Sequence, residues 1–281
     1  MLKTKIKNIL KKILFSINPL YRKIITIQEQ IEDLKKIYPI KKDVIENIIG
    51  KNNEVQYNNS KFTDISFNIK GDDNFIQIHE FCIIKNTNFD IIGNNNKIII
   101  ENSCSFINSL FFIKGNNNNI YIKENVSFAG KVEFKITCNK GYIEIGKFTT
   151  GQLNNSFEIS ENDLKIVVGN DCMFSSNILV WTQDFHPIFN NKNERINNGK
   201  DVFINDHVWV GYDVKILKGV EIGKNNIIGT NTIVTKAFKE ENVIIAGNPG
   251  RIIKTSVNWK RKMEKKKKSA LRLTSGNSSP P

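Results

Sequence analysis

The chain has 281 residues, and its 41 Lys and Arg against 28 Asp and Glu give a formal net charge of +13. With 40% hydrophobic and 25% charged residues it is not a wholly disordered chain, and it fits one elongated or β-rich domain with appendages. The whole excess of positive charge lies in residues 1–40 and 255–281, and the part between them is neutral. A neutral body argues against a protein that binds nucleic acid.

The first 40 residues predict a basic helical arm. Apolar residues recur at helical spacing through residues 2–17, with the lysines mostly off that stripe, and Asn18-Pro19 then interrupts the pattern. Residues 1–18 suit either peripheral contact with an anionic membrane or docking on a protein surface, and both alternatives stay open. Residues 24–34 have the alternating spacing of three and four of a short heptad seam, which would assist an oligomer formed elsewhere.

The cysteines and the apolar runs bear on the compartment and on metal binding. The four cysteines, at positions 82, 104, 138 and 172, are not spaced like zinc ligands, so we expect buried free thiols and no metal. No run reaches the roughly 18 apolar residues of a membrane span, and the N-terminus lacks a secretory signal. We therefore expect a cytoplasmic protein, with contact on the inner face of the membrane if the basic arm binds lipid.

Residues 55–254 predict a β-solenoid because of their repeats. Aliphatic residues recur at every sixth position at Ile204, Val210, Ile216, Ile222, Ile228 and Val234. A looser repeat with spacings of 22 or 23 residues begins at Ile78, Ile100, Ile122, Ile145 and Val168. Most of these repeats follow a corner rich in Asn and Gly, residues that tolerate left-handed backbone. A period of six fits short strands separated by tight corners, and it explains why the chain holds 40 Asn.

One interruption of the repeat carries the candidate chemistry. The hexads run in phase to Val180 and resume at Ile204, so residues 181–203 form an extruded loop, and long loops are disproportionately functional. The loop holds His186, whose residue type can take a proton from a hydroxyl and return it to a leaving group near neutral pH. Asp184 is a candidate to orient His186, and Asn177, at the corner before the loop, is a candidate to hold an acceptor.

Several segments resemble the hexapeptide-repeat acyltransferases, and within them the sugar and polysaccharide O-acetyltransferases. They are Asp184-Phe-His-Pro-Ile188, Asp206-His-Val-Trp-Val-Gly211, Val214-Lys-Ile-Leu-Lys-Gly219, Val234-Thr-Lys236 and Ile245-Ala-Gly-Asn-Pro-Gly-Arg251. Residues 194–201 and 259–263 are similar, more narrowly, to bacterial sialic acid or capsular polysaccharide O-acetyltransferases. The resemblance implies a left-handed parallel β-helix that works as a homotrimer.

The resemblance also implies an activity and its residues. It implies an acetyl-CoA-dependent O-acetyltransferase that acts by direct transfer, with His186 as general base and Trp209 as a wall between the acceptor and the CoA arm. CoA would contact Tyr212, Lys218, Thr230, Thr235, Lys236 and Arg251. The acceptor would be a cell-surface glycan sugar, with sialic acid favoured. The open alternatives are another sugar of a capsule or O-antigen unit, and a non-enzymatic β-solenoid that binds a partner.

The remaining histidines and the C-terminal tail are expected to play no part in catalysis. His79 is expected to be structural because it lies far upstream in a degenerate coil, and His207 because the family resemblance does not make it the base. The three histidines also lack the spacing of a three-histidine metal site. Residues 255–281 form a basic tail whose composition differs from that of the body, and from Trp259 onward we expect it to be disordered.

Overall fold

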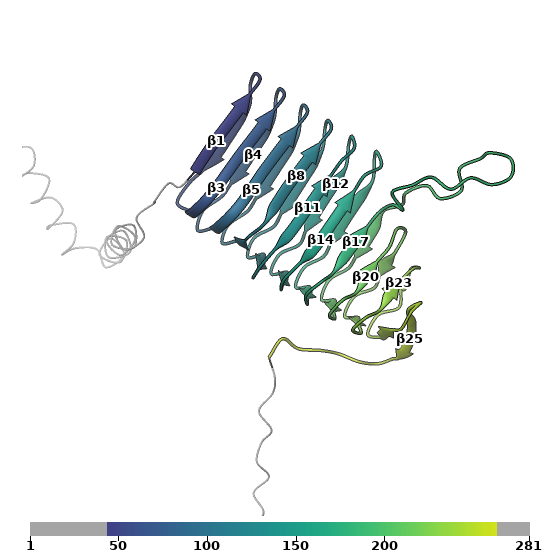
Figure 1. Ribbon diagram of the computed structural model, residues 1–281. Helices are drawn as coiled ribbons and strands as arrows, with labels where there is room; N and C mark the ends of the chain where they lie inside the picture. The colour runs from purple at the N-terminus through teal and green to yellow at the C-terminus, as the bar shows by residue number, and fades with distance from the viewer. Residues whose placement is uncertain (1–43, 263–281) are drawn as a thin grey trace, which may run out of the picture.

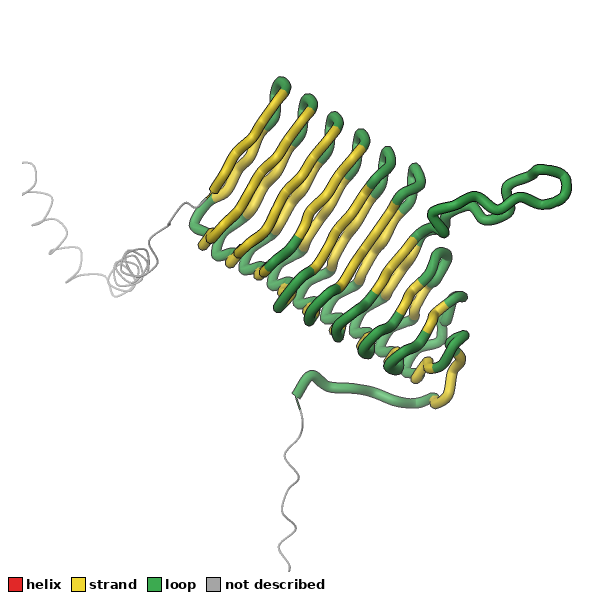
Figure 2. Tube along the Cα trace, viewed as in Figure 1, coloured by secondary structure: helices red, strands yellow, loops and turns green. Residues whose placement is uncertain are grey.

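The computed structural model describes residues 44–262, which form a parallel β-solenoid that contains no helix. Successive coils stack along one axis, and one long loop leaves the stack (Figure 1). Figure 2 shows that strands occupy the sides of the coils and that turns occupy the corners. The prediction of a mainly β, repetitive fold is confirmed.

The strands form three rows that run the length of the solenoid. The first row is β2 (Glu54–Tyr57), β4 (Phe75–Ile78), β6 (Lys97–Ile100), β9 (Asn119–Ile122), β12 (Tyr142–Ile145), β15 (Lys165–Val168), β18 (Val202–Ile204) and β21 (Glu221–Ile222). The second is β7 (Ser105–Ile107), β10 (Ser127–Phe128), β13 (Thr150–Gly151), β16 (Met173–Phe174), β19 (Trp209–Val210), β22 (Ile227–Ile228) and β24 (Ile244–Ala246). The third is β8 (Leu110–Lys114), β11 (Val132–Ile136), β14 (Asn155–Ile159), β17 (Leu179–Trp181), β20 (Lys215–Ile216) and β23 (Ile233–Val234).

Three further strands complete the first coils and one strand closes the last. β3 (Lys61–Lys70) and β5 (Ile83–Ile92) are long enough to span the second and third rows, and β1 (Val44–Ile49) pairs with the latter half of β3. β25 (Arg251–Lys254) pairs with β24, and this pair is antiparallel whereas the other strand pairs within residues 44–262 are parallel.

The core explains why the coils have two sizes. Phe67, Phe89, Phe111, Phe134 and Phe157 stack one above another inside the wide coils, with ring centroids 4.7–5.3 Å apart. Val180, Ile216 and Val234 continue the same interior row in the narrow coils. The register advances by 23 residues from Ile145 to Val168 but by only 18 from Ile204 to Ile222. Coil length therefore falls where the core changes from aromatic to aliphatic.

The corners account for the unusual number of asparagines. Asn74, Asn96 and Asn118 are buried, and each side-chain amide donates to the carboxamide oxygen one coil earlier at 2.9–3.0 Å. These amides satisfy one another where water is excluded, which a buried polar group requires. Beside them, Gly93 has φ +136°, and a Cβ placed on it would lie 1.9 Å from the carbonyl oxygen of Gly115. This corner therefore accepts only glycine.

The boundaries of the solenoid differ from those expected at both ends. β1 begins at Val44, before the expected start at residue 55, and residues 255–262 pack against the solenoid although a disordered tail was expected from Trp259. This part of the tail is held because Trp259 and Arg261 find partners on distant coils. The expected helical arm, with its membrane or heptad role, and the rest of the tail lie outside the described residues.

Residues 44–262 contain no helix long and apolar enough to cross a membrane.

Candidate active site

The loop between β17 and β18 leaves the solenoid and returns to it, and hydrogen bonds hold its two arms together. Its two ends meet where the Lys200 N–H donates to the Thr182 carbonyl at 2.9 Å, and it extends away from the coils (Figure 1). Toward its tip the two arms pair, with an antiparallel bridge between Phe189 and Arg195. The pairing from Val168 to Ile204 spans 36 residues instead of 18, so the loop adds 18 residues without disturbing the register of the coils.

Asn197 is the hub that holds the loop around His186. Its side chain is 7% exposed, and its amide donates to the His186 carbonyl at 2.8 Å and to Asp184 Oδ2 at 2.9 Å. Its oxygen accepts from the Ile188 N–H at 2.7 Å, so it holds the backbone at His186 and Ile188 and the side chain of Asp184. His186 itself is exposed. The clamp therefore fixes the backbone at His186 while leaving its imidazole open to a substrate.

An ion pair ties this hub to the solenoid. Lys218 Nζ lies 2.6 Å from Asp184 Oδ2 and also donates to the Asn197 carbonyl at 2.8 Å. The hydrogen bond from Lys218 holds the pKa of Asp184 below its ordinary value, and the bond from Asn197 adds to this. The Asp184 carboxylate is thus engaged by Lys218, and it is joined to the His186 backbone only through Asn197. Within one chain Lys218 anchors the loop, a role that the sequence did not indicate.

A second ion pair braces the other arm of the loop. Arg195 lies 2.5 Å from Glu161 on the preceding coil, and Glu161 also accepts from the Gly199 N–H at 3.1 Å. Partial burial alone would raise the pKa of the Glu161 carboxyl, but the hydrogen bonds from Arg195 and the Gly199 N–H, together with the nearby positive charges, outweigh it and lower that pKa. Glu161, Arg195 and Asn197 were missed by sequence reasoning. The only signal was that residues 194–201 carried the narrower family resemblance.

Trp209 lies on β19, on the outer surface of the second row. It is 38% exposed and stands between Met173 and Ile227 of the adjacent coils. Within residues 44–262 it makes no hydrogen bond or ring contact with His186. A single chain therefore does not bring the two predicted catalytic residues together.

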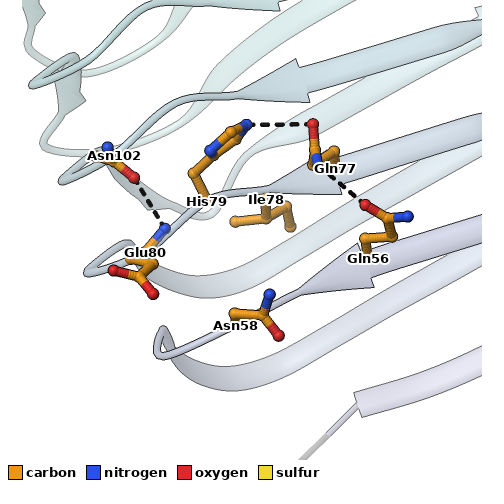
Figure 3. A pocket seen from close by; sticks show the side chains of 7 residues that line it. All are labelled: Gln56, Asn58, Gln77, Ile78, His79, Glu80 and Asn102. Atoms are coloured by element: carbon orange, nitrogen blue, oxygen red, sulfur yellow. Dashed lines mark hydrogen bonds between the residues drawn. The ribbon is translucent and has the colours of Figure 1, made fainter.

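The other two histidines lie on the solenoid, away from the loop. His207 occupies a corner with φ +56°, where its ring stacks on Trp259. His79 lines a pocket of about 340 Å³ on the first coils, with Nε2 3.2 Å from Gln77 Oε1 (Figure 3). It lies five coils before His207 in the register from Ile78 to Ile204. Within residues 44–262 no group of three or more metal-ligating side chains occurs.

The remaining predicted residues fall into two places. Asn177 and Tyr212 meet, with the Asn177 amide donating to the tyrosine hydroxyl at 2.8 Å, so the predicted acceptor and CoA contacts adjoin here. The other four predicted CoA contacts are exposed side chains on the final coils, namely Thr230, Thr235, Lys236 and Arg251. They offer hydroxyl and cationic groups of the kind that phosphates bind.

Comparison with known proteins agrees with this fold. The family model described as bacterial transferase hexapeptide (six repeats) matches residues 201–236. A solved structure of the polysialic acid O-acetyltransferase OatWY is 37% identical with a TM-score of 0.67, and the match covers 72% of this chain and 94% of that one. The chain therefore belongs to the hexapeptide-repeat O-acetyltransferases, and its solenoid is of their left-handed β-helix type.

Two curated relatives point to the same branch of the family. The polysialic acid O-acetyltransferase of Escherichia coli O1:K1 is 35% identical over 133 residues, which are 47% of this chain and 42% of the relative. That of Neisseria meningitidis is 40% identical over 111 residues, 39% of this chain and 51% of the relative. The chain thus spans about half the length of the curated relatives that it matches.

Proposed function

We propose that the protein is an acetyl-CoA-dependent O-acetyltransferase that acetylates a hydroxyl of a sialic acid in a cell-surface glycan. The observation that carries this proposal is the exposed His186 on a loop clamped by Asn197, projecting from a solenoid of the O-acetyltransferase family. The relatives named for polysialic acid support the acceptor. The alternatives are another glycan sugar and a solenoid that binds without catalysis.

His186 would act as the general base for direct transfer. Its imidazole takes the proton of the acceptor hydroxyl as the oxygen attacks the thioester carbonyl carbon, forming a tetrahedral intermediate. Collapse of the intermediate breaks the bond between carbon and sulfur, and the imidazolium returns the proton to the departing thiolate of CoA. The hydroxyl oxygen of the sugar becomes the bridging oxygen of the acetyl ester and the carbonyl re-forms, so no covalent acyl-enzyme is needed.

CoA would lie along the final coils. Lys236 and Arg251 are exposed there and would pair with its phosphates, while Thr230 and Thr235 would donate hydroxyl hydrogen bonds. Asn177 and Tyr212, already joined to each other, would border the acceptor.

We propose that the working form is a homotrimer because one chain does not assemble the site. The loop that contains His186 extends from the coils, whereas Trp209 lies on the solenoid surface, and the two side chains make no contact within one chain. Around a threefold axis, the loop of one copy reaches the face of the next, and His186 would meet Trp209 of a neighbour across the interface.

The test is transfer from acetyl-CoA measured as release of free thiol, with oligomers of sialic acid compared with neutral oligosaccharides. His186→Ala should lower kcat at least a hundredfold, since a general base contributes roughly 10²–10⁴. His79→Ala, on the first coils, is the matched control and should keep its rate. Equal thiol release by wild type and His186→Ala would overturn the proposed mechanism. If the protein transferred acetyl groups to neutral sugars alone, the proposed acceptor, sialic acid, would be wrong and a neutral sugar would take its place. An absence of CoA binding would favour the non-enzymatic alternative.

A further inference from the structure

The segment after β25 turns back along one edge of the solenoid. The Val257 N–H donates to the Asn242 carbonyl at 2.9 Å, and the Trp259 indole N–H donates to the His207 carbonyl at 2.9 Å. Arg261 then reaches Asp171. Asn242, His207 and Asp171 are corners of successively earlier coils, so residues 255–262 form a strap that runs backward over the corners (Figure 1).

The middle of the strap packs against the two aromatic side chains of one coil. Trp259 is 5% exposed, and its ring stacks on His207 with centroids 4.2 Å apart and planes at 8°. The Trp209 ring lies 6.1 Å away at 48°, the separation of a direct aromatic contact. His207 is held from its other side by Asn225, whose Oδ1 lies 3.1 Å from Nδ1. Trp259 is therefore fixed by the solenoid and in turn covers part of Trp209.

The end of the strap is clamped by Arg261. Its Nε donates to Asp171 Oδ1 at 2.7 Å and its Nη1 to Thr150 Oγ1 at 2.6 Å. Its Nη2 donates to the carbonyls of Phe148 at 3.0 Å and Cys172 at 2.8 Å. A guanidinium has five N–H groups, so these four bonds leave little capacity for an outside anion. Arg261 is thus a clamp across two adjacent coils rather than a binding group for an acidic sugar.

We infer that Trp259, held in place by Arg261, is a positioning residue that sets the orientation of Trp209 for the acceptor. This inference rests on the proposed function and on the family resemblance, which implies that Trp209 forms a wall beside the acceptor. An exposed Trp on a short strand can rotate about two side-chain bonds, and a neighbouring ring that is itself immobile removes part of this freedom. The strap makes the wall rigid before the acceptor arrives, which lowers the entropic cost of binding it.

The experiment compares Trp259→Ala, Trp259→Phe and Arg261→Ala with Lys254→Ala, an exposed residue of β25, as the control. An aromatic pair contributes about 0.5–1.5 kcal/mol beyond its area, so Trp259→Ala should raise the KM for the acceptor up to about tenfold. The KM for acetyl-CoA should not change, Trp259→Phe should recover most of the loss, and Arg261→Ala should reproduce it. A merely structural strap would instead lower the melting temperature and impair both substrates together, and either that result or an unchanged acceptor KM would overturn the inference.

A second measurement does not depend on activity. Two indoles in contact give an exciton-coupled signal in the far-ultraviolet circular dichroism, and it should disappear in Trp209→Phe and Trp259→Phe and weaken in Arg261→Ala. A signal unaffected by Arg261→Ala would overturn the inference even if wild type transferred no acetyl group. Absence of transfer by wild type would count against the proposed function alone.

Discussion

Removing the side chain of Asn197 should release the loop while leaving the solenoid intact. Asn197→Ala removes three well-formed hydrogen bonds, those to the His186 carbonyl, Asp184 and the Ile188 N–H. None of these groups belongs to the apolar core, which is built from the interiors of the coils. The change therefore acts on a local equilibrium between the ordered and the open loop rather than on global unfolding.

The size of the effect follows from the hydrogen bonds. Each contributes about 1 kcal/mol net, so the three together stabilise the ordered loop by about 3 kcal/mol. Since 1.4 kcal/mol is a factor of ten, the ordered population falls by up to about a hundredfold, and kcat/KM should fall with it. Asn197→Asp should be at least as damaging, because it removes both amide donors and sets a second carboxylate beside Asp184.

The assay pairs thiol release with limited proteolysis of the loop and thermal melting. We expect faster cleavage within residues 184–198 and lower activity, with the melting temperature within a few degrees of wild type. Asn198→Ala, at the exposed neighbouring position, should behave as wild type in all three measurements. If Asn197→Ala kept wild-type activity and protease resistance, the view of Asn197 as the hub of the loop would be wrong.

Two further predictions concern the corner and the ion pair. Gly93→Ala should destabilise the solenoid by about 3 kcal/mol or more, because its Cβ would meet a backbone oxygen at a φ that side chains rarely adopt. In Gly130→Ala the new Cβ would meet Leu153, and the close contact is with the flexible end of its side chain, so an equal drop in melting temperature would contradict the reasoning. For pH, the pKa of Asp184 is lowered on folding, so its contribution to loop order is complete above the ordinary Asp pKa of about 3.9 and is lost as pH falls further. Loop protection followed by hydrogen exchange should therefore persist down to about pH 4, and Lys218→Met should move its loss to higher pH; an unchanged midpoint would refute the role of the pair.

The fold could be predicted because its interior repeats in sequence. The hexads from Ile204 to Val234 place one aliphatic side chain on each side of a narrow coil, and this period has no counterpart in helices or simple strands. The first coil was missed because β1 follows no such pattern, and its exposed Ile45 and Ile49 face away from the core. The corner at Phe148 was equally hidden, since its φ of +60° is unusual for a bulky residue.

The candidate site was predictable only where its residues lie close together in sequence. His186 and Asp184 share a short segment, and an interrupted repeat marked it. The clamp of Arg261 joins it to residues 90 and 111 positions earlier, and no local pattern indicates such partners. The same holds for Arg195 and Glu161, which are 34 positions apart. Contacts between distant coils depend on the stacking of the whole solenoid, which a single sequence does not display.

The closed neck of the loop, where Lys200 meets Thr182, has a consequence for how such proteins change. Because the coils before and after the loop keep their strand pairing, the loop can be replaced by another without changing the solenoid. The length and the tip of the loop can change without a loss of folding stability, provided that Asn197 and the ion pairs of Lys218 with Asp184 and of Arg195 with Glu161 are kept. If the loop contacts the acceptor as proposed, selectivity among acceptors can evolve through the loop, separately from the stability of the solenoid.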